Sequence, residues 1–291
     1  MRGRGLLCVC GAAMLAACGA ELTGPGAADD GDDGGGGSWS EPVRVAGASS
    51  QDDEDDPTLG ASTLEIFFSY ADPNDGGNKH LYFMTRPSRS GAWSQPQTLP
   101  FDAPGQVDQT PRLSMDELTL YFASDRDPDG RGLDIYQVSR PSIGGPWGQP
   151  QRLDEVDDPG EDDKWFAPCP GGYYMLISKR GRGNGDDVYA GQLGQGAPAL
   201  VSELSTMRGE TGPYLSGDCN TIHFASQRTG PNKLYTSHRG AVTEKWSDPV
   251  ELSDFATLGG DQEDPWLAPD GRTFVFVSDV AGSKDVYIST R

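Results

Sequence analysis

Three aspartates at every second position are the first residues here whose type and spacing could do chemistry. The stretch SDRDPDGRGLDIY carries Asp125, Asp127 and Asp129 ahead of a glycine. Calcium loops begin this way, because their oxygen ligands converge on the ion at about 2.3–2.6 Å. The ninth and twelfth loop positions, which should supply further ligands, are Leu133 and Tyr136. We therefore interpret the stretch as a structural hairpin, with a weak Ca²⁺ site as the alternative and no other cofactor expected.

A second set of acidic residues belongs to a phrase that recurs five times along the chain. Its copies are EDDPTL, DQTPRLSMDE, DDKWFAPCPGG, ETGPYLSGDC and QEDPWLAPDG. We align them on Pro57, Pro111, Trp165, Pro213 and Pro265, which gives spacings of 54, 54, 48 and 52 residues. Each copy then begins with an acid or an amide three residues earlier: Glu54, Asp108, Asp162, Glu210 and Gln262.

Every copy of the phrase is followed by the same order of short apolar runs. The second runs are LEIFFS, LTLYFAS, YYMLIS, TIHFAS and TFVFVS, and a turn rich in glycine and charge leads to a third run such as DIYQVSR. A final short phrase, for example WSQPQTL, completes the unit, although the third repeat has only APALV there. Four β-strands in about fifty residues are typical of a β-propeller blade, so the sequence predicts an all-β, five-bladed propeller of four-stranded blades.

The two ends of the repeat array predict how the ring closes. The chain stops after the third strand of the fifth repeat, whereas WSEPVRV, residues 39–45, precedes the first repeat without a blade of its own. We expect this N-terminal strand to complete the last blade, because that leaves no free sheet edge. The propeller domain is therefore predicted to span residues 38–291.

The repeat motifs resemble a known family. The series P-x-L-S-x-D, F-x-S-D-R and D-I-Y-x-x-S-R is similar to the WD40-like propeller repeat of TolB and tricorn-type proteins, and the resemblance covers residues 38–291. It implies the propeller fold and leaves function broad, since the family spans binding modules, assembly partners and protease-associated domains. Repeat three departs from the pattern at Trp165, and repeat five has Val280 in place of arginine.

The acids at the head of the phrase are the better candidate site. Glu54, Asp108, Asp162 and Glu210 are expected to begin the innermost strands around the channel mouth, with Trp165, Tyr214 and Trp266 near the same level. Crowded carboxylates could bind a cation, a basic side chain or sugar hydroxyls, and the tryptophans could stack on a sugar. The alternative is that each acid binds backbone of the neighbouring blade, repeated because the fold repeats.

No catalytic motif supports an enzyme. The sequence contains no G-x-S-x-G, no H-E-x-x-H and no phosphate loop, and we assign no catalytic residue. Among the histidines, His223 is expected in the core, while His80 and His238 are expected at the surface. A glycosidase-like propeller using channel acids stays as the alternative function, because glycoside cleavage needs only two or three carboxylates.

The N-terminus has the layout of a secretory signal that resembles a bacterial lipoprotein signal. Arg2 and Arg4 precede a short apolar stretch, and LAAC ends at Cys18. The resemblance implies cleavage after residues 1–17, lipidation of Cys18 and an outer-membrane destination. Residues 18–37 then form a flexible Asp- and Gly-rich tether.

Charge and cysteines complete the functional prediction. A net charge of −21 disfavours nucleic acid and favours basic partners. Cys169 and Cys219 remain after the signal and the lipidated residue, and we expect them to form a disulfide. The sequence thus predicts a monomeric lipoprotein, periplasmic or surface-exposed and held to the membrane only by lipid. Its propeller would bind an envelope protein or a glycan.

Overall fold

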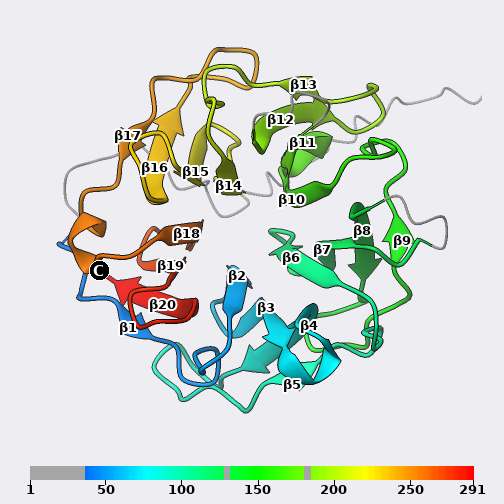
Figure 1. Ribbon diagram of the computed structural model, residues 1–291, viewed down its shortest axis with the longest axis vertical. Helices are drawn as coiled ribbons and strands as arrows, with labels where there is room; N and C mark the ends of the chain where they lie inside the picture. The colour runs from blue at the N-terminus through cyan, green and yellow to red at the C-terminus, as the bar shows by residue number, and fades with distance from the viewer. Residues whose placement is uncertain (1–36, 128–131, 180–184) are drawn as a thin grey trace, which may run out of the picture. The chain divides into compact units, whose positions relative to one another are not determined.

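Five antiparallel sheets form a ring in the computed structural model, which describes residues 37–127, 132–179 and 185–291 (Figure 1). Blade 1 contains β2 (Glu54–Leu59), β3 (Glu65–Asp72), β4 (Asn78–Thr85) and β5 (Gln97–Thr98). Blade 2 contains β6 (Asp108–Leu113), β7 (Thr119–Ser124), β8 (Asp134–Ser139) and β9 (Gln151–Arg152). Blade 3 contains β10 (Asp163–Pro168), β11 (Tyr173–Ser178), β12 (Asp187–Gln192) and β13 (Ala199–Leu200). Blade 4 contains β14 (Glu210–Leu215), β15 (Thr221–Ser226), β16 (Lys233–His238) and β17 (Val250–Glu251).

The fifth blade is built from both ends of the described chain. It contains β18 (Gln262–Leu267), β19 (Thr273–Ser278), β20 (Asp285–Thr290) and, as its outer strand, β1 (Val43–Arg44). Strands β1 and β20 are antiparallel, with Val43 opposite Ile288. The predicted five-bladed propeller, closed by its N-terminal strand, is therefore confirmed. The signal, Cys18 and the tether up to residue 36 lie outside the described residues.

The hydrophobic core lies between neighbouring blades. The middle strands are apolar on both faces, and every residue of β19 is buried. Each of the five core clusters draws most of its side chains from two adjacent blades, including one that joins blade 5 to blade 1. Burial of apolar surface at each junction stabilises the ring, so every blade depends on its two neighbours to bury its apolar side chains.

Four blades share an arginine–tryptophan pair on the rim where the first-to-second-strand turns lie. In each pair the guanidinium stacks on the indole, and its Nε donates a hydrogen bond to a backbone carbonyl of the turn. The pairs are Arg86–Trp93 (4.4 Å from Cζ to the ring centroid), Arg140–Trp147 (4.6 Å), Arg239–Trp246 (4.2 Å) and Arg291–Trp39 (4.5 Å). Blade 3 lacks the tryptophan, as its sequence indicates.

A disulfide joins blades 3 and 4 on this same rim. Cys169 and Cys219, 50 residues apart, lie in the first-to-second-strand turns, with their Cα atoms 5.9 Å apart. Both cysteines are buried in the core cluster between the two blades. The bond therefore crosslinks an interface that is already packed.

Removing this disulfide should destabilise the protein. We expect the Cys169→Ser/Cys219→Ser variant to lose about 2–4 kcal/mol of unfolding free energy, because closing a loop of this length restricts the unfolded chain. Urea unfolding of the variant and of the oxidised wild type measures the difference. Wild type kept in reductant is the control and should approach the variant. Equal midpoints for all three would contradict the prediction.

Helices contribute little to the described residues. Only three 3₁₀ turns are present there, η1 (Pro73–Asp75), η2 (Pro170–Gly172) and η3 (Ala256–Leu258). A search of these residues for a helix with the length and hydropathy of a membrane span finds none.

Candidate functional site

The first residue of each innermost strand anchors the loop that enters the blade. These residues are Glu54, Asp108, Asp163, Glu210 and Gln262, and all five are buried. In repeat three the position belongs to Asp163, so the sequence alignment that selected Asp162 is wrong by one residue. The error arose because the sequence alignment matched Trp165 to the prolines of the other repeats, whereas the fourth residue of β10 is Phe166. Phe166 is the structural counterpart of the prolines.

The contacts of these side chains are local. Glu54 accepts a hydrogen bond from the Ser50 amide (2.8 Å), Asp163 from the Asp158 amide (2.8 Å) and Glu210 from the Thr206 amide (3.0 Å). Asp108 accepts two hydrogen bonds from Arg126, at 2.8 and 2.6 Å. Burial raises the pKa of Glu54, Asp108 and Glu210. Four buried carboxyl groups engaged in this way are structural and do not form an open ring of ligands. Their partners are the loops that enter the blade and, for Asp108, an arginine of the same blade, and not backbone of the neighbouring blade as the structural alternative expected.

The residues that face the centre of the ring come two positions later. Each innermost strand has an irregular register at this point, and the residue there has a positive φ. A bulge re-aims the side chain and interrupts regular pairing, which resumes two residues later in each strand. The five residues are Asp56, Thr110, Trp165, Gly212 and Asp264. Their sequence signal is the residue directly before the recurring proline, or before Phe166 in repeat three. Among them we singled out Trp165 from the sequence and missed the other four.

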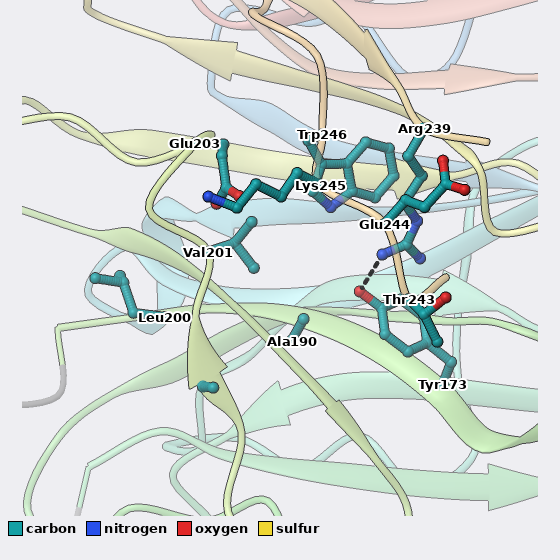
Figure 2. A pocket seen from close by; sticks show the side chains of 11 residues that line it. Tyr173, Ala190, Leu200, Val201, Glu203, Arg239, Thr243, Glu244, Lys245 and Trp246 are labelled. Carbon is teal, nitrogen blue, oxygen red and sulfur yellow. Dashed lines mark hydrogen bonds between the residues drawn. The ribbon is translucent and has the colours of Figure 1, made fainter. Parts of the chain in front are cut away.

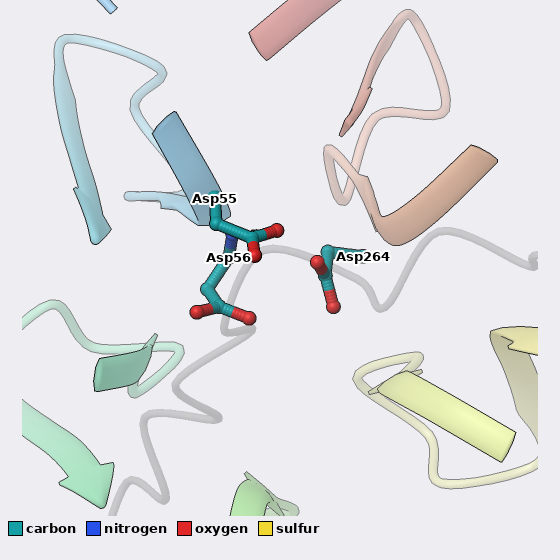
Figure 3. Close-up of side chains that lie close together, drawn as sticks. All are labelled: Asp55, Asp56 and Asp264. Atoms are coloured by element: carbon teal, nitrogen blue, oxygen red, sulfur yellow. The ribbon is translucent and has the colours of Figure 1, made fainter. Parts of the chain in front are cut away.

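Two of these residues form an acidic cluster with Asp55. Asp55 and Asp56 come from β2, and Asp264 comes from β18 in the neighbouring fifth blade (Figure 3). One oxygen from each carboxyl group lies within 4.8 Å of the other two, and at most 2% of each residue is exposed. We call these three residues the channel triad. Sequence reasoning missed it, although closing the ring makes blades 1 and 5 neighbours.

Asp56 is held by groups from three blades. Its Oδ1 accepts a hydrogen bond from Trp165 Nε1 (2.7 Å), and its Oδ2 accepts from Ser69 Oγ (2.7 Å) and from the Thr110 amide (3.3 Å). Trp165 is thus a buried hydrogen-bond donor that reaches across the channel. Trp266 is buried too and packs on Tyr214. Neither indole presents an open face to a sugar.

Two lysines approach the channel triad from the rim where the innermost strands begin. Lys79 Nζ lies 2.8 Å and Lys284 Nζ 3.0 Å from Asp55 Oδ2, and Lys284 also lies 2.6 Å from Glu263 Oε2. Burial opposes ionisation of Asp55, but the two ammonium groups outweigh it and lower its pKa. For Asp264, burial and then the charges of Asp56 and Asp55 raise the pKa well above its usual range. The channel therefore contains a buried network of ion pairs.

This arrangement differs from that of a glycosidase site. Glycoside hydrolysis places two carboxyl groups on either side of a bond in a bound sugar, so both must reach the substrate. The channel triad is closed off from solvent on all three residues.

The rim hairpin between β7 and β8 uses its described acids structurally. Asp125 is exposed, and its Oδ1 accepts a hydrogen bond from the Val107 amide (2.8 Å). Asp127 forms an ion pair with Arg152. Asp129 lies outside the described residues. The two described contacts agree with a hairpin, and Ca²⁺ binding there stays untested.

A shallow pocket of about 200 Å³ lies between blades 3 and 4, away from the channel (Figure 2). Leu200 and Val201 line one side, and Arg239 extends between Tyr173 and Trp246 on the other. Arg239 Nη1 donates a hydrogen bond to the Tyr173 hydroxyl (3.1 Å), and its guanidinium stacks on both rings. Because the Arg239 guanidinium is already stacked on two aromatic rings, we assign no ligand to this pocket.

The histidines occupy three different environments. His223 is buried and stacks on Tyr214, and burial lowers its pKa to about 4. His238 is exposed, as predicted. The prediction for His80 is wrong: the ring is 5% exposed, with Nδ1 3.0 Å from Asp102 and Nε2 3.0 Å from Asp75. The carboxylates explain its burial, because they satisfy both ring nitrogens.

His80 should make stability depend on pH. Burial disfavours its charged form, but the hydrogen bonds and charges of Asp102 and Asp75 outweigh burial and raise its pKa. A raised folded-state pKa stabilises the protein fully below the unfolded value of about 6.5, and this contribution is lost as pH rises through the folded value. Melting temperatures measured from pH 6 to 9 should therefore fall more in wild type than in His80→Gln. The His238→Gln variant should follow wild type, and identical slopes for all three would refute the assignment.

Solved structures with a similar fold belong to proteins of different function. An endo-arabinase from Bacteroides thetaiotaomicron has a TM-score of 0.59 at 15% identity, over 86% of this chain and 97% of that one. A thermostable family-43 glycoside hydrolase has a TM-score of 0.58 at 14% identity, over 84% and 91%. A protein assigned as TolB from Agrobacterium tumefaciens has a TM-score of 0.50 at 15% identity, over 81% and 76%. No family model and no curated protein matches the sequence. At these identities the likenesses establish the fold and transfer no activity.

Proposed function

We propose that this chain is a lipid-anchored envelope protein whose propeller binds a basic protein partner. The signal-like residues 1–17, Cys18 and the acidic tether up to residue 37 support the anchor. The propeller supplies a rigid ring, and the partner meets the rim where the innermost strands begin. We call this surface the acidic rim.

The observation that carries the proposal is how the carboxyl groups divide between the channel and the acidic rim. Those in the channel are buried and engaged with lysines, amides and an indole. Exposed acids lie on the loops and hairpins of the acidic rim, at Asp53, Asp125, Asp154, Glu155, Asp254 and Asp279. The opposite rim also exposes acids, namely Asp116, Asp218, Glu244 and Asp270, but they share that surface with the exposed cations Arg89, Lys245, Arg272 and Arg291. Solvent-facing acids on several blades attract a basic surface and speed its association. A glycan offers no charge to complement them.

Site-specific photo-crosslinking in the producing cells tests the proposal. A crosslinking residue at Asp125, which is exposed on the acidic rim, should capture one discrete protein. The matched control is a crosslinker at Asp116, which is exposed on the opposite rim. Capture at position 125 should weaken as salt is raised in a lysate, because exposed charges are screened. Equal capture at both positions, or none at either, would contradict a basic partner on the acidic rim.

The anchor is tested separately. A Cys18→Ser variant should lose incorporation of labelled fatty acid and move from the membrane fraction to the soluble fraction. Membrane association that persists in the variant would remove the lipid anchor from the proposal and leave the partner untouched.

A further inference from the structure

Asp264 is the least satisfied member of the channel triad. It is fully buried, and neither of its carboxylate oxygens has a hydrogen-bond donor among the described residues. One of its carboxyl oxygens lies within 4.8 Å of an oxygen of Asp55, which is itself an acceptor. Two ionised carboxylates at that distance repel each other, so the contact requires a positive charge between them.

The charges around the channel triad are also unbalanced. Glu263 joins the three aspartates, which makes four carboxyl groups. The opposing groups are Lys79, Lys284 and Arg112, whose buried guanidinium is near enough to interact electrostatically with Asp264 and Asp56. With all four carboxyl groups ionised, three cationic groups leave the channel one positive charge short, and either a proton on Asp264 or a bound cation supplies it.

The backbone of β14 packs closely against Asp264. Gly212 has a φ of +56°, and a Cβ atom at this position would lie 2.3 Å from Asp264 Oδ1. Glycine therefore allows Asp264 to approach this closely, and a side chain at position 212 would displace its carboxyl group. The three carboxyl oxygens, within 4.8 Å of one another, match the spread of ligands around an ion that binds oxygen at about 2.3–2.6 Å.

We propose that Asp55, Asp56 and Asp264 bind a hard divalent cation, Ca²⁺, at the centre of the channel. Oxygen-only ligands with flexible geometry favour Ca²⁺ over metals that prefer imidazole or thiolate. Lys79 and Lys284 contact Asp55 through Oδ2, while among the described residues the one hydrogen bond to Oδ1 comes from the Asp56 amide, at 3.2 Å. Both lysine side chains are partly exposed, 24% and 32%, so they can withdraw toward solvent when the ion enters.

The lysines make a specific prediction about affinity. Each ammonium group repels a cation in the channel, so together they weaken Ca²⁺ binding. Lys284→Met removes one of them and also frees Glu263. The variant should bind Ca²⁺ more tightly than wild type. A site elsewhere on the acidic surface would not respond to this change.

Binding is measured on the full-length chain after chelation, with Tb³⁺ as the luminescent probe and Ca²⁺ as its competitor. Trp165 donates a hydrogen bond to Asp56 and can sensitise Tb³⁺ bound beside it. Wild type should give one saturable signal that Ca²⁺ displaces. Asp264→Asn, which is isosteric, should weaken it at least about tenfold through loss of a charged ligand. Asp125→Asn, on the exposed rim, should leave it unchanged.

The same measurements can overturn the proposal. A saturable signal that survives Asp264→Asn would place the ion elsewhere. No saturable signal in wild type or in Lys284→Met would exclude the site. If Asp264→Asn then also melts at a higher temperature than wild type in metal-free buffer, a proton on Asp264 supplies the missing charge instead.

Discussion

Deleting Asp285–Arg291 should abolish cooperative unfolding. The deletion removes β20, which pairs with β19 on one side and with β1 on the other. It also takes Val286 and Tyr287 out of the core and leaves two sheet edges unpaired. The combined loss is comparable to the whole stability of an ordinary domain, about 5–15 kcal/mol. Thermal melting followed by circular dichroism should show no sharp transition, and a truncated chain that melts like the full one would refute ring closure.

A crosslink across the same junction provides the complementary control. Val43 and Ile288 are directly opposite each other, and Val43 is largely exposed. The Val43→Cys/Ile288→Cys variant should form a disulfide that non-reducing gels detect, and it should melt at a higher temperature when oxidised. Free thiols in the folded variant would show that these strands are not paired.

Arg140→Ala should cost about 3–5 kcal/mol of unfolding free energy. Arg140 is buried, its guanidinium pairs through both terminal nitrogens with Glu65 of blade 1, and Nε donates to the Glu117 carbonyl (2.9 Å). The guanidinium also stacks on Trp147. Removing the cation leaves Glu65 as an uncompensated buried charge, and this destabilises a protein more than replacing both partners by apolar residues. Urea unfolding measures the effect.

Arg89→Ala is the matched control for Arg140→Ala. Arg89 pairs with Asp270, but the two side chains are 52% and 34% exposed. Solvent screens such a pair, so its loss should cost about 0–1 kcal/mol. The double variant Arg140→Met/Glu65→Leu should recover part of the stability lost in Arg140→Ala, because it removes the stranded charge. Similar losses for Arg89→Ala and Arg140→Ala would mean that burial does not set the cost.

The fold could be predicted because the repeats encode strands and the ends encode closure. The strand-like segment WSEPVRV lies at one end, and the repeat at the other end lacks an outer strand. Pairing the two leaves no free sheet edge, and β1 and β20 form this pair. The register of repeat three was harder to predict. Without a proline, only packing distinguishes Trp165 from Phe166, and the sequence alignment chose the wrong aromatic residue.

The site was less predictable, because burial and proximity across blades decide it. Repetition located the acids that begin the innermost strands, but it could not show that Glu54 and Glu210 turn back to their own loops. The channel triad depends on β2 and β18 meeting across the junction of blades 5 and 1. His80 looked like a surface residue because Asp75 and Asp102, which satisfy its ring, are separated from it in sequence.

The pairing of β1 with β20 also governs the order in which the protein can be completed during synthesis. Val43 is made about 245 residues before its partner Ile288. At about 5–20 residues per second, the first strand is synthesised roughly 12–50 seconds before the last. The interval between the synthesis of Trp39 and that of its stacking partner Arg291 is similar. Until β20 is made, the blade 1 face of its junction with blade 5 is uncovered, so the ring can close only when the whole propeller segment is available.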